Sequence, residues 1–398
     1  MGSDLAWPAL SWETHEWVSS SPDDLVSRRM RTRHAGPYHA AVPPVIAALP
    51  VTLPEAALVL AEEAAVEIAR FDAEVGVDIA PFSSILLRSE STASSRIEHL
   101  TSSARSIALA ELGSDLRANA AEIVGNVHAM QAALDLAHRL DEGAILAMHR
   151  ALLAAHDPQE AGRWRTQQVW IGGYGYGPHE AAFVPPHHQH VPVAMADLVR
   201  FVHRDDLPVL VQAAIAHAQF ETIHPFTDGN GRTGRALVHA ILYGKRLTRA
   251  VTVPVSAGLL TDTDAYFDAL TAYRSGDPEV IVRQVAEASF RAISNGRQLV
   301  QELREIRTSW NERIHARRDA VVWQLADVLL RQPVIDAALV QRELGATSAN
   351  AHRAIRQLEA AGVITEFTDK KRNRLWQVPW VLQALDDFAE RAGRRVGR

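Results

Sequence analysis

The chain has 398 residues, of which 47% are hydrophobic, and a formal net charge of −6; this composition is ample for a core and suggests roughly two to three domains. The absence of cysteine excludes disulfides, cysteine nucleophiles and thiolate metal sites. The negative charge gives no global attraction to nucleic acid or anionic membranes. No apolar run approaches the roughly 18 residues of a membrane span, and the N-terminus lacks a signal-peptide pattern, so we expect a cytoplasmic protein without a membrane partner.

The first half of the chain is predicted to be mainly helical. Residues up to about Val42 are polar and irregular, and helical patterns follow over 53–75 and 82–112, with alanine-rich helical segments continuing to His156. Two short apolar runs then flank a Gly/Tyr turn, which predicts a β-hairpin within 167–186. The histidines within 187–190 fit a solvated loop after a Pro-Pro turn better than a metal site.

The segment 224–235, HPFTDGNGRTGR, predicts a nucleotide-phosphate site. Gly229 and Gly231, on either side of Asn230, can adopt positive φ, so that consecutive backbone N–H groups form an anion cradle. A helix predicted from Thr233 to Lys245 places its positive N-terminal dipole at the loop.

Three charged side chains of this segment suit the same ligand. Arg232 and Arg235 lie three residues apart on the first helical turn and can grip phosphate oxygens. Asp228 can carry Mg²⁺ to those phosphates.

His224 follows a predicted buried helix, Leu207 to Ile223, which Pro225 ends. A neutral imidazole at that position, facing the cradle, could act as a general base. His217 and Glu221 share a helix face with His224, and the pairs Glu221/His224 and Glu312/His315 have the Glu-x-x-His spacing of di-iron bundles. A metal site would leave the glycines and arginines without a role, so structural roles for His217 and Glu221 are favoured, with Phe226 as a core anchor.

The pattern H-x-F-x-D-G-N-G-R-x-x-R resembles that of the Fic domain, whose eight defining positions are all matched. Most members of that family transfer AMP from ATP to a Ser, Thr or Tyr hydroxyl of a target protein. The resemblance implies that His224 is the base, Asp228 the Mg²⁺ ligand, Gly229 to Arg232 the cradle for the α- and β-phosphates, and Arg235 the γ-phosphate clamp. Glycine rather than lysine at Gly231 favours AMP transfer over phosphorylation.

A second segment, 91–99, resembles the inhibitory helix of the same family, whose pattern is Ser/Thr-x-x-x-Glu followed by Gly or Asn. Ser94 and Glu98 match, whereas His99 departs from the last position. The resemblance implies that Glu98 pairs with Arg235 and withdraws it from the γ-phosphate. The alternative is an ordinary amphipathic helix with a surface ion pair.

Two further elements resemble parts of the family's site. The predicted hairpin resembles the flap that holds the target's extended backbone by strand addition. Tyr266 and Phe267, in a predicted helix from Asp264 to Arg274, would supply the adenine wall.

The C-terminal region resembles a winged helix-turn-helix. The stretch 282–330 predicts a connecting helix or helix pair, after which come helices over 335–344 and 348–360, a strand over 362–367, a basic tip at 370–374 and a return strand at 375–378. The second of these helices offers Asn350, His352, Arg353, Arg356 and Gln357 to DNA, and the tip adds Lys370, Lys371, Arg372 and Arg374. Such modules also serve in dimerisation and protein docking.

These observations divide the chain into five parts: an N-terminal extension (1–52), a helical region (53–125), a Fic core (126–290), a connecting helix (291–332) and a winged helix (333–398). The inhibitory helix is expected at about 82–112, within the helical region. The favoured hypothesis is an autoinhibited AMP transferase using ATP and Mg²⁺ on a hydroxyl-bearing protein, which could be the chain itself. A homodimer is a further expectation. The alternative is an ATP-sensing, DNA-binding transcriptional regulator. His224 favours the enzyme, because a sensor needs no base.

Overall fold

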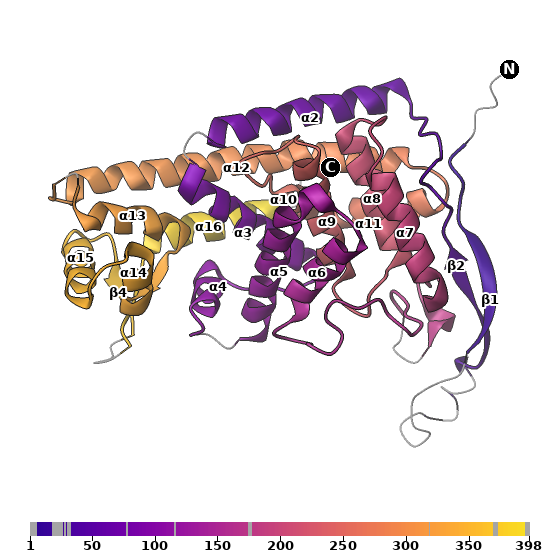
Figure 1. Cartoon of the computed structure of the whole chain (residues 1–398), viewed down its shortest axis with the longest axis horizontal. Coiled ribbons are helices and arrows are strands. Elements are labelled where there is room, and N and C mark those ends of the chain that lie inside the picture. The colour runs from indigo at the N-terminus through magenta and orange to yellow at the C-terminus, as the bar shows by residue number, and fades with distance from the viewer. Residues whose placement is uncertain are drawn as a thin grey trace.

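The computed structural model describes residues 6–17, 27, 29, 33–76, 79–114, 117–173, 177–317, 319–368 and 373–394. The protein is mainly helical, as predicted (Figure 1). Its α-helices in the core are α2 (Glu55–Gly76), α3 (Ile79–Ile97), α4 (Ala104–Glu111), α5 (Ala118–Asp135), α6 (Glu142–Leu153), α7 (Val191–Val202), α8 (Val209–Ile223), α9 (Asn230–Gly244), α10 (Val255–Leu259), α11 (Thr263–Arg274) and α12 (Glu279–Arg313). Short 3₁₀ turns cover Ala137–Arg139, Pro178–Glu180, His188–His190 and Leu260–Asp262.

Helix α8 forms the centre of the core. Every residue from Leu210 to Ile223 is buried, because apolar residues occur on every side of the helix and other helices surround it. It packs on α7, α9, α11 and α12, while α2 lies along α12 (Figure 1). Within the described part of the chain, no helix is both long and apolar enough to cross a membrane.

The N-terminal extension contains a hairpin, so the prediction of irregular structure up to Val42 was wrong. Strands β1 (Ser11–Trp17) and β2 (Gly36–Val42) pair antiparallel along their whole length. In β1 the only apolar residues are Trp12 and Trp17, and polar residues separate them, which concealed the strand pattern. The hairpin lies at the end of the molecule opposite α14 and α15 (Figure 1).

The predicted flap is smaller than expected in the described residues. Only one antiparallel bridge, between Ile171 and Phe183, takes the place of two full strands; 174–176 lie outside the described residues. Strand β2 extends this bridge on one side, because the Ala41 N–H donates to the Val184 carbonyl at 3.0 Å.

The single helix predicted over 82–112 is broken into α3 and α4. His99 adopts a left-handed φ of 62° after α3, and the Leu100 and His99 N–H groups donate to the carbonyls of Ser95 and Arg96, each at 3.0 Å. This is a Schellman helix end, in which the residue with positive φ is usually glycine or asparagine. The departure of His99 from the family pattern therefore falls where left-handed backbone is required.

The C-terminal region combines α13 (Val321–Arg331), β3 (Val334–Asp336), α14 (Ala337–Leu344), α15 (Ser348–Ala360), β4 (Thr365–Glu366) and β5 (Leu375–Gln377). The strands form one antiparallel sheet in the order β3-β5-β4. Ile335, expected in the first helix, lies in β3 instead. The chain order is that expected of a winged helix, and this assignment stays a prediction. Lys370, Lys371 and Arg372 of the tip lie outside the described residues.

Helix α16 (Pro379–Gly393) was not predicted. It leaves the C-terminal sheet and packs on α12, α3 and α4, and Leu385 and Phe388 join the main core. The domain boundaries stay predictions.

Candidate active site

The loop between α8 and α9 begins at His224, which has left-handed backbone angles of φ 50° and ψ 61°. That conformation costs a non-glycine residue about 1–2 kcal/mol, so other groups must hold it. Buried Arg165 does so: its Nε donates to the His224 carbonyl at 2.8 Å and its guanidinium also donates to the Pro186 carbonyl at 2.5 Å. Arg165 therefore joins the turn at the base to the end of the flap.

Asn230 closes the loop at its other end. Its Oδ1 accepts the Phe226 N–H and its Nδ2 donates to the Phe226 carbonyl, both at 2.9 Å. Phe226 is fully buried and stacks on His149 with ring centroids 3.6 Å apart, so it is the core anchor that was expected. Both polar atoms of the Asn230 side chain thus bond within the loop, which leaves its backbone N–H for the predicted phosphate role.

The cradle differs in detail from the prediction. Gly229 has a φ of 73° and caps α9, but Gly231 does not share this positive φ, because α9 begins at Asn230 rather than Thr233. Gly231 instead provides space, since a Cβ at this position would lie 1.9 Å from Glu98 Oε1. The N–H groups of this first turn are the unpaired donors that bind anions at helix N-termini.

An open hollow of about 620 Å³ adjoins this helix end, lined by Glu98, Leu100, Glu122, His224, Thr227, Asp228, Gly229, Asn230, Gly231 and Arg232. The structure thus brings together the predicted base, the predicted Mg²⁺ ligand and the cradle.

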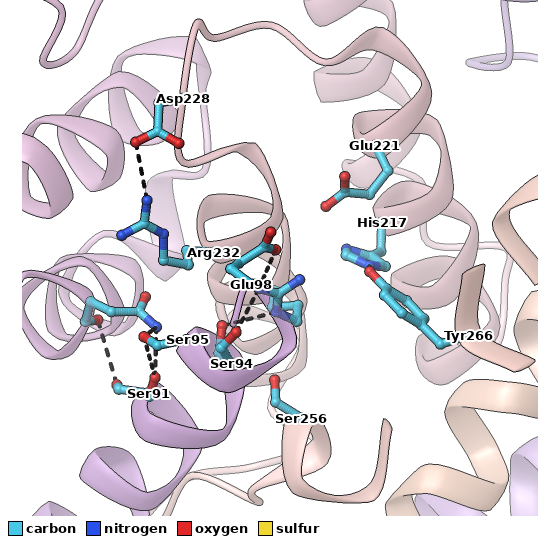
Figure 2. A network of polar contacts seen from close by, with 12 residues as sticks. Ser91, Ser94, Ser95, Glu98, His217, Glu221, Asp228, Arg232, Ser256 and Tyr266 are labelled. Atoms are coloured by element: carbon cyan, nitrogen blue, oxygen red, sulfur yellow. Dashed lines mark hydrogen bonds and ion pairs between the residues drawn. The ribbon is translucent and has the colours of Figure 1, made fainter. Parts of the chain in front are cut away.

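Asp228 meets the chemical requirement for a magnesium ligand. Its side chain is 62% exposed and its one ion pair in the described residues is to Arg232 at 3.2 Å (Figure 2). Mg²⁺ is usually held by one or two carboxylates together with substrate phosphates. A single exposed carboxylate beside an anion cradle fits that requirement. Among the described residues, no three or more carboxylate or imidazole side chains are grouped so that they could hold one metal ion. His217, Glu221 and His224 are included in this finding.

Arg235 is bound to α3 by three hydrogen bonds. Its Nε donates to Ser94 Oγ at 2.9 Å, and one terminal nitrogen donates to the Ser94 carbonyl and to Glu98 Oε1, each at 2.8 Å. The ion pair inferred from the resemblance is therefore present. Arg235 is only 3% exposed and the Glu98 side chain is 40% exposed, so the pair is partly buried, and its inhibitory role stays a prediction.

Other contacts fix the core-facing side of α3. Glu90, fully buried, accepts from Ser256 and lies 2.9 Å from His239 Nε2. Asn126 donates to the Ser91 carbonyl and to Ser95 Oγ. The helix that carries Glu98 is thus anchored to α5, α9 and α10.

Burial controls the protonation of the groups around His224. Desolvation lowers the pKa of His224 to about 3, and the positive charges of Arg165 and Arg274 act in the same direction. Desolvation raises the pKa of nearby Glu221 to about 7. At neutral pH the imidazole of His224 is therefore uncharged and able to accept a proton.

Residues 139–242 match the Fic/DOC family. The chain carries a Fic domain. The Fic proteins it resembles include "Protein adenylyltransferase fic-1" of Caenorhabditis briggsae, 35% identical over 159 residues, which are 39% of this chain and 28% of that protein. The protein of the same name from Caenorhabditis elegans is 36% identical over 152 residues, 37% of this chain and 27% of that protein. The match thus spans little more than a quarter of the length of these relatives.

A solved structure shares the fold around the Fic domain. The Fic family protein from Desulfovibrio desulfuricans G20 has a TM-score of 0.53 and 22% identity, and the alignment covers 83% of this chain and 97% of that one. At this identity the likeness concerns the fold alone.

The adenine wall predicted for the Fic domain is only half available. Tyr266 is 1% exposed, so its ring has no free face. Its hydroxyl lies 2.7 Å from His217 Nε2 (Figure 2). Phe267, in contrast, is 48% exposed. Tyr266 is therefore a core residue here, and only Phe267 stays a candidate for base stacking.

Three residues of the Fic domain and its surroundings escaped the sequence reasoning: His149, Arg165 and Glu122. His149 Nε2 lies 3.1 Å from the Asp228 carbonyl, and Glu122 pairs with Arg232 at 3.3 Å. Each is an isolated polar residue far from the motif in sequence, and nothing in its neighbours marks it.

Proposed function

We propose that the chain is a protein adenylyltransferase that moves AMP from ATP to a Ser, Thr or Tyr hydroxyl of a protein. The relatives matched by the Fic domain bear that name. The observation that carries the proposal is that an uncharged His224 lines the same hollow as the first turn of α9. A base and an anion cradle at one site suit group transfer from a nucleotide, whereas binding alone needs only the cradle.

In this reaction the target's hydroxyl oxygen forms a bond to the α-phosphorus of ATP, the bond from that phosphorus to the β-phosphate oxygen breaks, and pyrophosphate leaves. The hydroxyl proton passes to the imidazole of His224. A pKa of about 3 makes the free imidazole a weak base, but a triphosphate beside it favours the protonated form and raises that pKa. Arg165 and the left-handed turn hold the ring in place.

The remaining residues of the motif would bind the triphosphate. The N–H groups of Gly231 and Arg232 would hold the α- and β-phosphates, and Arg235 the γ-phosphate. Asp228 would hold Mg²⁺, which supplies charge neutralisation on the phosphates when bound.

We further propose that Glu98 inhibits this reaction. Its carboxylate occupies Arg235 and lies over Gly231, so it takes both the clamp and the space above the cradle. A triphosphate and Glu98 would compete for the same cation, since one guanidinium side cannot serve both.

Incubation with α-labelled ATP and Mg²⁺ tests the proposal. We expect label on protein with Glu98→Gly, little with wild type, and none with Glu98→Gly/His224→Ala, while the double variant still binds ATP. γ-Labelled ATP is the matched control, because AMP transfer leaves that phosphate in pyrophosphate. Label from the γ- but not the α-position would establish phosphorylation instead. Label that survives loss of His224 would refute its role as base.

A DNA-binding function is the second candidate, favoured by the surface of α15. Asn350, His352, Arg353, Arg356 and Gln357 are all exposed on that helix. We expect that Arg353→Ala/Arg356→Ala would reduce the slope of log affinity against log salt by about 2 in a DNA titration. Arg342→Ala, exposed on α14, is the control; an unchanged slope in the double variant would place any DNA contacts elsewhere.

A further inference from the structure

A second hollow lies behind the helix that carries Glu98. It measures about 420 Å³, counted with its open mouth, and lies between α3, α4 and α16. Its walls are Arg88, Ser89, Thr92, Ala93, Arg96, Ser102, Ala104, Ile107, Leu385, Asp386, Phe388 and Ala389. By helical spacing, the α3 residues among these lie on the side opposite to Ser94 and Glu98.

Ser89 presents an unused hydroxyl to this hollow. It is 5% exposed, and its Oγ has no hydrogen-bond partner in the described structure. Its neighbours on α3 behave differently, because Ser91 and Thr92 donate to the carbonyls four residues earlier, at 2.9 and 2.8 Å. A buried hydroxyl without a partner loses its hydration without compensation.

Arg96 adds a positive charge without a counter-ion. It is half-buried, burial lowers its pKa, and its guanidinium donates to the Ala389 carbonyl of α16. No carboxylate of the described residues forms an ion pair with it. Arg88, in contrast, is neutralised by Glu111 at 2.7 Å.

The rest of the lining is mainly apolar, with one carboxylate. Ala93, Ile107, Leu385 and Phe388 supply carbon surface. Asp386 also lines the hollow, and its Oδ1 accepts the Ala104 N–H at 2.8 Å. That contact places its charge at the positive end of α4.

We propose that this hollow binds a small organic carboxylate with a short apolar body, and that its occupancy weakens inhibition by Glu98. The carboxylate would pair with Arg96 and accept the Ser89 hydroxyl proton in a hydrogen bond, while the body packs on Leu385 and Phe388. The binding part is independent of the adenylyltransferase activity. The regulatory part rests on that proposed function.

The route to Glu98 is short. Arg96 stands two residues before Glu98 on the last turn of α3, and its bond to Ala389 ties that turn to α16. A carboxylate on Arg96 competes with the Ala389 carbonyl for the same guanidinium. Loss of that tie removes one of the contacts that hold the last turn of α3, and so weakens the hold of the Glu98 carboxylate on Arg235.

Calorimetric titration of the full chain with benzoate tests the binding part, with benzyl alcohol as the uncharged probe of similar shape. We expect wild type to bind benzoate more tightly than benzyl alcohol, and Ser89→Ala to weaken benzoate by about two- to tenfold. Arg96→Gln should remove the preference for the charged probe, while Arg96→Lys keeps part of it. Arg394→Gln, an exposed arginine paired with Glu390, should change nothing.

Equal binding of both probes by wild type, no binding of benzoate, or an unaltered preference in a folded Arg96→Gln variant would overturn the site. For the regulatory part, benzoate should increase labelling from α-labelled ATP in wild type but not in Glu98→Gly. Bound benzoate without that increase, in preparations where Glu98→Gly is active, would overturn it. If Glu98→Gly itself is inactive, the proposed enzyme function fails, and the calorimetric result still decides the binding site.

Discussion

Replacing His99 with glycine should tighten inhibition. His99 takes the left-handed position of the Schellman end directly after Glu98. A side chain there costs about 1–2 kcal/mol, whereas the greater freedom of glycine in the unfolded chain returns about 0.5–1 kcal/mol of that advantage. The net gain is about 0.5–1 kcal/mol for the ordered helix end, which multiplies the ratio of molecules with Glu98 on Arg235 to molecules with Glu98 released by about two- to fivefold.

The assay is the initial rate of labelling from α-labelled ATP, measured beside a thermal melt. We expect His99→Gly to lower the basal rate about two- to fivefold and to raise the melting temperature by about 1 °C. In a Glu98→Gly background the same change should leave the rate unaltered, because no carboxylate remains to be positioned.

Arg246 provides a matched control. It has the same φ of 62° at the end of α9, and its N–H and that of Leu247 donate to carbonyls in the same pattern. Arg246→Gly should stabilise the protein to a similar extent without changing the rate. A faster rate in His99→Gly, or equal slowing by both variants, would refute the reasoning.

Three further changes test the site. Burial raises the pKa of Glu221 to about 7 from 4.5, so the folded state binds its proton more tightly, and the stability from this group falls as pH rises through that window. In denaturant melts, Glu221→Gln should therefore gain on the order of 1–3 kcal/mol in the free energy of unfolding relative to wild type between pH 5 and 8. A difference that stays constant with pH would argue against a buried neutral carboxyl. Gly231→Ala should weaken ATP binding at least about tenfold, even when combined with Glu98→Gly, because the added carbon would enter the cradle as well as contact Glu98. If calorimetry shows that the double variant recovers ATP binding, only the contact with Glu98 mattered. Arg165→Lys should lower kcat for labelling about 10- to 100-fold while the Kd for ATP changes less than about threefold, because lysine cannot bridge the carbonyls that fix the base; an equal loss of ATP binding would indicate general loosening of the loop.

The local part of the site was accessible from the sequence. The motif 224–235 concentrates residue types whose chemistry is specific, and the apolar helix before it predicted the burial of α8. Glu98 and Arg235 are far apart in the chain, and only the resemblance to the Fic family connected them before the structure did. The prediction that both glycines adopt left-handed backbone was wrong at Gly231. A glycine required for its backbone conformation and a glycine required because a side chain would not fit cannot be told apart in the sequence.

Other elements were missed for different physical reasons. Arg165 acts by donating hydrogen bonds to backbone carbonyls of distant segments. Every residue has such a carbonyl, so the sequence does not mark the ones that Arg165 binds. Strand β1 has two tryptophans among polar residues, and most of the strand is exposed, so its pattern is weak. Helix α16 could have been found, since Pro379 stands in its first turn and apolar residues recur at Val381, Leu385 and Phe388.

Helix α16 also changes how force would pass through the molecule. The C-terminal module is entered from α12 and left through α16, and these two helices pack on each other. A domain attached by a single linker can rotate about that linker, so a force on the domain is absorbed there. A domain attached at two adjacent points cannot rotate freely and passes the force on to both attachments. Any load placed on α15 by a partner therefore reaches α16 and its contact with the last turn of α3, within two residues of Glu98.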